Sequence, residues 1–293
     1  MRVLVIGGTG TVGSEIVPRL LKRGVDTRVL TRSPEKHPSD EVEYVAGDLE
    51  RPASLAQAFE GVDRVYLLTP LHPREAEIGL AAVRAASETG VERIVLQTVH
   101  RAGEAPYVPH FASKLEMLQA IREAGIPWVD LAPNSFFQND LRYREALLQH
   151  GVYPQPIGHA GASRVDVRDI ADLAVVTLLE PGYEERSIAV VGAQVLTGGR
   201  TAEVWSRVLD RPVQYIGDDL EAWSTQVRGF IPDWMVDDLV MMYRFFQEKG
   251  LAATDEELDE VRRILGREPR SFDDFAAETA ARWRDLKPTL TRP

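Results

Sequence analysis

The stretch VIGGTGTVGSEI, residues 5–16, constrains the fold more than any other part of the chain. Gly7, Gly10 and Gly13 follow a short apolar run and open a helical pattern. Glycines at such a turn give the backbone φ freedom and let it approach a pyrophosphate, which the N-terminus of the next helix attracts. The spacing is GxxGxxG rather than GxGxxG, and a turn without a ligand is the alternative. We predict a dinucleotide-binding turn.

Short apolar runs alternate with helical patterns along the chain. Strands are expected at residues 3–6, 27–30, 42–45, 65–68, 94–97, 128–131 and 187–191. Their nearly continuous apolar character is typical of parallel strands that are covered on both faces. Between them lie helical spacings, such as that of Val167–Leu179. The alternation predicts an α/β fold with a doubly wound parallel sheet of the Rossmann type.

The alternation breaks after Pro133. The stretch that follows is rich in Gly and Pro, and the chain beyond Thr201 reads as mostly helical and acidic. We therefore expect residues 1–133, completed by 165–192, to form the nucleotide-binding Rossmann domain. Residues 134–164 and 193–293 are expected to form a smaller, mostly helical and discontinuous substrate-binding cap.

Charge and composition exclude several classes of function. The formal net charge is -11 and no basic cluster is present, so neither nucleic acid nor an anionic membrane is an expected partner. The chain has no Cys, which excludes disulfides, thiolate metal sites and a Cys nucleophile. The six His residues show no ligand spacing, so no metal is expected. The apolar run at the N-terminus is too short for a signal peptide or a membrane span, and a cytoplasmic monomer or homodimer is expected.

The residues after the second strand favour NADP(H) over NAD(H). An acidic residue about 20 positions beyond the glycine turn would bind the ribose hydroxyls of NAD and repel a 2′-phosphate. This chain instead reads RVLTRSPEKH, with Arg32 at that place and Lys36 close behind. A guanidinium suits a 2′-phosphate, whereas a solvated loop arginine is the alternative.

Two further strand ends are candidates for cofactor contact. Asp48, in VAGDLE, could accept a hydrogen bond from the adenine amino group, or it could cap the helix expected in RPASLAQAF. The sequence LLTP, residues 67–70, is expected to form a wall beside the adenine ribose. The stretch HFASKLE places His110 and Lys114 four residues apart, on one face of a helix, where both could contact one small ligand.

The sequence resembles the NmrA-like group of atypical short-chain dehydrogenases/reductases. The resemblance rests on GGTGTVG, TRSPEKH, VEYVAGDL, HFASKLEM, IPWVDLAPNSFFQN and VDVRDIADLA, in that order, and continues through VLTGGRTAEVWSRVLDRPVQYI and ILGREPRSFDDFAAE. It implies an NADP(H)-binding Rossmann domain with a small C-terminal substrate domain. Members of the group include quinone oxidoreductases, reductases of plant phenolics, and proteins that bind dinucleotide without turnover and report redox state.

The resemblance also implies roles for individual residues. Ordinary short-chain dehydrogenases carry Tyr-x-x-x-Lys, in which the lysine holds the nicotinamide ribose; here Lys114 matches the lysine and His110 stands in place of the tyrosine. His110 could donate a proton, or it could only pack against the preceding loop. Thr98 lies near the Ser or Thr that orients a substrate carbonyl, whereas capping of its own backbone is the alternative. Phe136 and Phe137 could hold a flat substrate or anchor their loop in the core.

The full set of expected cofactor contacts is Gly7, Thr9, Gly10, Thr11, Val12, Gly13, Thr31, Arg32, Asp48, Leu49, Leu68, Thr69, Lys114 and Pro133.

Two features near the C-terminus have structural interpretations. A stripe of Met235, Leu239, Met242 and Phe246 is interpreted as core of the cap or as a subunit contact, with a cavity-lining role as the alternative. The run ATDEELDEVRR is expected to be a solvated helix capped by Thr254.

Two functions compete. The first is an NADPH-dependent oxidoreductase that reduces a quinone-like or other flat conjugated molecule, with Lys114 and His110 beside the reacting oxygen. The second is a redox sensor that binds NADP(H) with little or no turnover. An epimerase, a lyase or an imine-reductase-like enzyme remains as a minor alternative.

Overall fold

A parallel sheet of seven strands forms the centre of the structure, a computed structural model that describes residues 1–285. The strand order is β3-β2-β1-β4-β5-β6-β8. The strands are β1 (Arg2–Ile6), β2 (Asp26–Thr31), β3 (Glu43–Ala46), β4 (Arg64–Leu67), β5 (Arg93–Gln97), β6 (Trp128–Pro133) and β8 (Arg186–Val190). All seven are parallel, with Ile6 in register with Leu30 on one side and Leu67 on the other. The order reverses between β1 and β4, and ligands of such sheets bind at that crevice.

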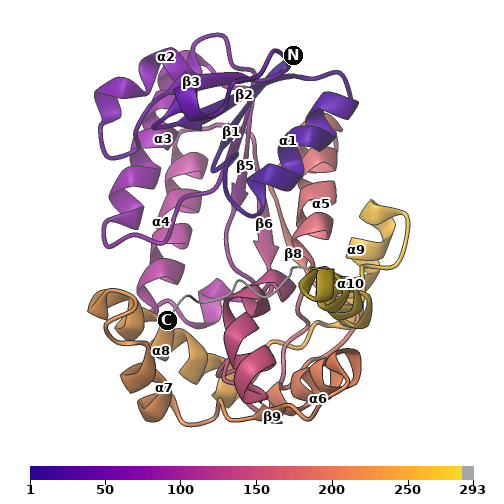
Figure 1. The fold of residues 1–293 in the computed structure, drawn as a ribbon. Helices are drawn as coiled ribbons and strands as arrows, with labels where there is room; N and C mark the ends of the chain where they lie inside the picture. The colour runs from indigo at the N-terminus through magenta and orange to yellow at the C-terminus, as the bar shows by residue number, and fades with distance from the viewer. Residues whose placement is uncertain (286–293) are drawn as a thin grey trace.

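Helices cover both faces of the sheet (Figure 1). On one face lie α1 (Gly13–Lys22), α5 (Val167–Leu179) and α9 (Asp255–Leu265), and on the other lie α2 (Ala56–Phe59), α3 (Glu75–Thr89) and α4 (Pro109–Glu123). Two apolar clusters, one on each face, bury the alternate side chains of the strands. This explains why the strands are apolar on both faces, and the predicted doubly wound α/β sheet is confirmed.

A second region, mostly helical, lies below the sheet in Figure 1, at the carboxyl ends of its strands. It contains α6 (Gly198–Leu209), α7 (Leu220–Val227), α8 (Asp233–Lys249), α10 (Phe272–Asp285) and the paired short strands β7 (Val152–Tyr153) and β9 (Gln214–Tyr215). Shorter helical segments span Pro34–Lys36, Pro52–Ser54, Ala102–Glu104, Phe137–Tyr143 and Ala146–His150. Between Thr201 and Asp285 the chain is mostly helical, as expected.

One helix of the expected cap lies elsewhere. Helix α9 packs on α5 and β8, and its Val261 is buried in the core cluster of that face. Residues 193–293 therefore do not all belong to the lower region, because α9 extends the layer that covers the sheet. Thr254 caps α9 through a capping box with Glu257, which confirms the predicted cap.

Strand boundaries differ from the predicted ones by a residue or two. The strand expected at 42–45 is Glu43–Ala46, and that expected at 65–68 is Arg64–Leu67. The predicted helix Val167–Leu179 has the expected bounds. Within residues 1–285, no helix combines the length and the apolar character that crossing a bilayer requires.

A buried ion pair holds the lower region together. Arg164 Nη2 lies 2.6 Å from Asp140 Oδ1, and both side chains are fully buried. Asp140 also accepts hydrogen bonds from Tyr153 Oη and Trp205 Nε1, at 3.0 and 2.9 Å. The pair therefore joins the loop after β6 to β7 and α6. Burial lowers the pKa of the Arg164 guanidinium, but Asp140, together with Tyr153 and Tyr243, raises it more, so the pKa is raised overall.

Replacing Arg164 should destabilise the fold strongly. In the variant Arg164→Met, the carboxylate of Asp140 stays buried without its cation, and we expect the free energy of unfolding to fall by about 3–5 kcal/mol. Arg200→Met is the matched control, because Arg200 pairs with Glu203 on the surface, and it should cost less than about 0.5 kcal/mol. Urea denaturation monitored by Trp fluorescence measures both; equal losses would contradict a structural role for the buried pair.

Candidate dinucleotide and substrate site

One large cavity, of about 890 Å³, runs along the carboxyl ends of the central strands. It begins at the turn between β1 and α1 and passes the ends of β4, β5 and β6. It ends against α8 of the lower region. The cavity therefore starts at the point where the strand order reverses, which is the binding position expected for a dinucleotide.

The glycine turn is built for close backbone contact. Gly7 has φ of 83°, a conformation that favours glycine. A Cβ atom on Gly13 would lie 2.2 Å from the Gly7 carbonyl oxygen, so only glycine lets α1 start this close to the turn. In the described part of the chain, no hydrogen-bond acceptor is found for the main-chain amides of Thr11 and Val12. These amides at the start of α1 fit an anion such as a diphosphate.

Most of the expected turn residues line the cavity, with one exception. Gly7, Thr9, Gly10, Thr11 and Val12 line it. Gly13 is not among the lining residues, and its contact with the cofactor stays a prediction. Its role is to allow the approach of α1 described above.

Residues at the ends of β2 and β3 form the part of the cavity where the adenosine is expected. Thr31, Arg32, Asp48 and Leu49 all line it. The Arg32 side chain is exposed and has no carboxylate partner within the described residues. Asp48 Oδ1 accepts from the amide of Glu50 at 3.1 Å and so closes a turn. It does not cap the helix in RPASLAQAF, which corrects that alternative; the α2 N-cap has no side-chain hydrogen bond.

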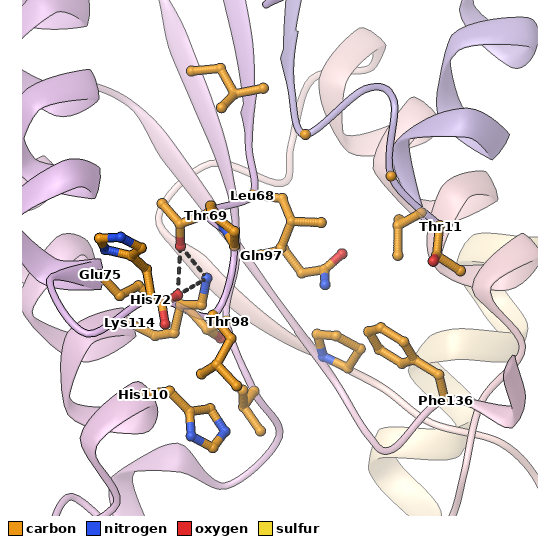
Figure 2. A pocket seen from close by; sticks show the side chains of 18 of the residues that line it. Thr11, Leu68, Thr69, His72, Glu75, Gln97, Thr98, His110, Lys114 and Phe136 are labelled. Carbon is orange, nitrogen blue, oxygen red and sulfur yellow. Dashed lines mark hydrogen bonds and ion pairs between the residues drawn. The ribbon is translucent and has the colours of Figure 1, made fainter. Parts of the chain in front are cut away.

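A buried triangle of polar side chains lies farther along the cavity (Figure 2). Lys114 Nζ donates to Thr69 Oγ1 at 2.6 Å and lies 2.8 Å from Glu75 Oε1. Thr69 Oγ1 in turn donates to Glu75 Oε1 at 2.6 Å. Burial lowers the pKa of the Lys114 ammonium, and the carboxylate of Glu75 opposes that shift. Lys114 is thus a buried cation that lines the cavity with Leu68, Thr69 and Pro133.

A glycine in α3 makes this triangle possible. A Cβ on Gly79 would lie 2.0 Å from Met117 Sδ, so α3 and α4 approach each other closely there. Glu75 lies one turn before Gly79, and Lys114 lies one turn before Met117. Sequence reasoning missed Glu75, although an acidic residue at the start of the helix that follows LLTP was a usable signal.

His110 is held by a carboxylate from the lower region. Its Nδ1 hydrogen-bonds Asp238 Oδ1, and its main-chain amide donates to Asp238 Oδ2 at 3.2 Å. Asp238 comes from α8 and is only 4% exposed. Since Nδ1 is engaged, Nε2 is the ring nitrogen left for a ligand in the cavity, which His110 lines. Sequence reasoning missed Asp238, which lies 128 residues away.

Thr98 is oriented into the sheet rather than toward a ligand. Its hydroxyl donates to Asp130 Oδ1 and its amide donates to Leu131 O at 2.8 Å. Burial raises the pKa of Asp130. The hydroxyl proton is therefore already used, which corrects the expectation that Thr98 donates to a substrate carbonyl, although the residue still borders the cavity.

The two neighbouring phenylalanines have different environments. Phe136 lines the cavity on the side opposite Lys114 (Figure 2). Phe137 is 1% exposed, and its ring packs on Phe272 and Phe275, with centroids 5.2 and 5.6 Å away. The substrate-contact expectation for Phe137 is wrong, and its ring is the anchor of the loop instead.

The far end of the cavity is formed mainly by α8 and the segment after β6. Leu239, Met242 and Phe246 line it, so most of the stripe interpreted as cap core or subunit contact faces the cavity. Arg142, Tyr143, Gln155 and Tyr243 add polar groups to this wall. Within residues 1–285, no group of His, Asp or Glu side chains is arranged to hold a metal ion.

Comparison with known proteins agrees with this architecture. The model of the NmrA-like family matches residues 1–276. The chain is 35% identical to an NAD(P)H azoreductase from Xenophilus azovorans over 95% of its own length and 98% of that protein. Its fold is similar to that of an NADPH-dependent quinone oxidoreductase from Escherichia coli complexed with NADPH, with a TM-score of 0.85, 19% identity and coverage of 96% and 99% of the two chains. It is also similar to the Citrobacter sp. triphenylmethane reductase complexed with NADP(H), with a TM-score of 0.82, 22% identity and coverage of 96% and 100%. The match of the family model and the identity to the azoreductase show that the chain belongs to the NmrA-like family.

Proposed function

We propose that the protein is an NADPH-dependent oxidoreductase that reduces a flat conjugated acceptor such as a quinone or an azo compound. The observation that carries this proposal is the single cavity that joins the glycine turn to a buried His–Asp pair and an apolar, aromatic far end. A binding protein without turnover needs the first of these features but not the other two. Relatives that are an azoreductase and a quinone oxidoreductase support the same class of acceptor.

The residues of the cavity fit NADPH. The amides of Thr11 and Val12 would hold the diphosphate, and the Arg32 guanidinium would pair with the 2′-phosphate. Lys114 would lie at the ribose of the nicotinamide half, as the family resemblance implies. When bound, NADPH supplies a hydride.

The protein must then align the acceptor and supply one proton. The acceptor takes up a hydride and a proton, so an oxygen or nitrogen of the acceptor must be protonated in the same cycle. His110 can hold that proton on Nε2 and release it, because Asp238 fixes the ring through Nδ1. The buried ammonium of Lys114, one helical turn away, stabilises negative charge that develops on the acceptor.

Arg32 should set the choice between the two pyridine nucleotides. In Arg32→Asp, the carboxylate repels the 2′-phosphate, and we expect the Kd for NADPH to rise about 100-fold while the Kd for NADH changes by less than about threefold. Lys36→Asp makes the same charge change at a residue that does not line the cavity, so it should have a small effect. Fluorescence titration measures all four constants; equal losses for NADPH and NADH in Arg32→Asp would sink the assignment.

The His110–Asp238 pair should act on turnover rather than on cofactor binding. In His110→Asn we expect kcat for NADPH oxidation with a quinone or an azo dye to fall roughly 100-fold, because the proton donor is lost. Asp238→Asn should lower kcat about tenfold through loss of ring orientation. The Kd for NADPH should be unchanged in both variants.

An exposed pair provides the matched control for that experiment. His159 lies 2.8 Å from Asp218 on the surface, and His159→Asn should leave kcat unchanged. If the wild-type protein binds NADPH but oxidises it with none of a panel of quinones, azo dyes and enones, the oxidoreductase proposal fails, and a redox-sensing role takes its place.

A further inference from the structure

The charges around the cavity are distributed unevenly. Three carboxylates line it, those of Asp48, Glu50 and Glu75, and all lie on the dinucleotide half. On the far side of His110 the lining contains apolar, phenolic and amide side chains and the guanidinium of Arg142 but no carboxylate, although the chain carries a net charge of -11. Asp140 and Asp238 lie behind this wall, but they are buried and engaged by Arg164 and His110.

Arg142 is the cation of this far end. It lines the cavity, its side chain is exposed, and no carboxylate within the described residues pairs with it. Its neighbours in the cavity wall are the phenols of Tyr143 and Tyr243, whose pKa values are raised by burial while the charge of Arg142 acts to lower them. Arg142, Tyr143 and Tyr243 thus line the same part of the cavity wall.

The segment that carries Arg142 is fixed on both sides. The short helix Phe137–Tyr143 begins with the buried ring of Phe137, and its Asp140 is locked in the ion pair with Arg164. The side chain of Arg142 makes no hydrogen bond within the described residues. The guanidinium of Arg142 therefore lies at the rim of the cavity, on a segment whose backbone is fixed, and it has no partner among the described residues.

We infer that the far end of the cavity binds an acceptor that carries an anionic substituent, such as a carboxylate or a sulfonate, on a flat conjugated body. The inference rests on the proposed function and names the acceptor class. The body would lie against Phe136, Met242 and Phe246, and its oxyanion would reach Arg142 with hydrogen bonds from the fork of the guanidinium. A cationic dye of the same size would meet like charge at this position and be disfavoured.

A matched pair of acceptors tests the inference. Methyl orange carries a sulfonate para to the azo group, its unsulfonated parent dye is neutral, and methyl red carries a carboxylate ortho to the azo group. With NADPH, we expect kcat/KM of the wild-type protein to be about tenfold higher for either anionic dye than for the neutral parent, since Arg142 is partly screened by solvent. A cationic triarylmethane dye should be the poorest acceptor of the set.

Three variants identify the residue responsible. Arg142→Gln should remove the preference, so that anionic and neutral dyes give similar kcat/KM. Arg142→Lys should restore part of the preference, because it keeps the charge without the fork. Arg144→Gln removes a positive charge two residues away that does not line the cavity, and it should keep the full preference.

A binding measurement separates this inference from the proposed function. Calorimetry of methyl orange and of the neutral dye with the NADP⁺-loaded protein requires no turnover. We expect methyl orange to bind about tenfold more tightly than its parent, with no such difference in Arg142→Gln. Failure of every dye to be reduced would overturn the proposed function alone. An equal affinity for both dyes in the wild type, or a preference that survives in Arg142→Gln, would overturn the anion subsite.

Discussion

The close approach of two glycines is the contact on which the rest of the site depends. A Cβ on Gly13 would lie 2.2 Å from the carbonyl oxygen of Gly7, so helix α1 can begin at the end of β1 only with glycine at that position. This approach places the amides of Thr11 and Val12 at the mouth of the cavity, where the partial positive charge of the helix N-terminus favours an anion. From this turn the cavity extends along the edge of the sheet, past the ends of β4, β5 and β6.

The polar residues farther along the cavity come from segments that are distant in the sequence. Lys114 and His110 lie one turn apart on α4, but each depends on a partner from another helix. Glu75 reaches Lys114 because Gly79 lets α3 pack on α4, and Asp238 reaches His110 because α8 closes the cavity from below. The lower region therefore would both enclose the acceptor and fix the residue proposed to protonate it.

The sequence predicted the sheet well because strands buried on both faces leave a nearly continuous apolar pattern, as in β1 and β5. It predicted the glycine turn because a helix that begins this close to the end of a strand requires glycine at the point of contact.

The sequence could not separate Phe136 from Phe137. Neighbouring residues in an extended segment point to opposite sides, and only the tertiary structure decides which side faces the core. Asp238 and Glu75 were missed for a similar reason: a carboxylate on a helix pattern looks solvated until its partner is known. The stripe on α8 was recognised, but whether it faced a core or a cavity was not encoded in its spacing.

The most direct test of this account is isothermal titration of NADPH into the purified protein. We expect saturable binding of one NADPH per chain, displaced by NADP⁺, because the amides of the glycine turn would hold its diphosphate and the guanidinium of Arg32 would hold its 2′-phosphate. The absence of heat with NADPH and with NADH would contradict it, and the roles assigned to Lys114, His110 and Arg142 would then have no cofactor to act with.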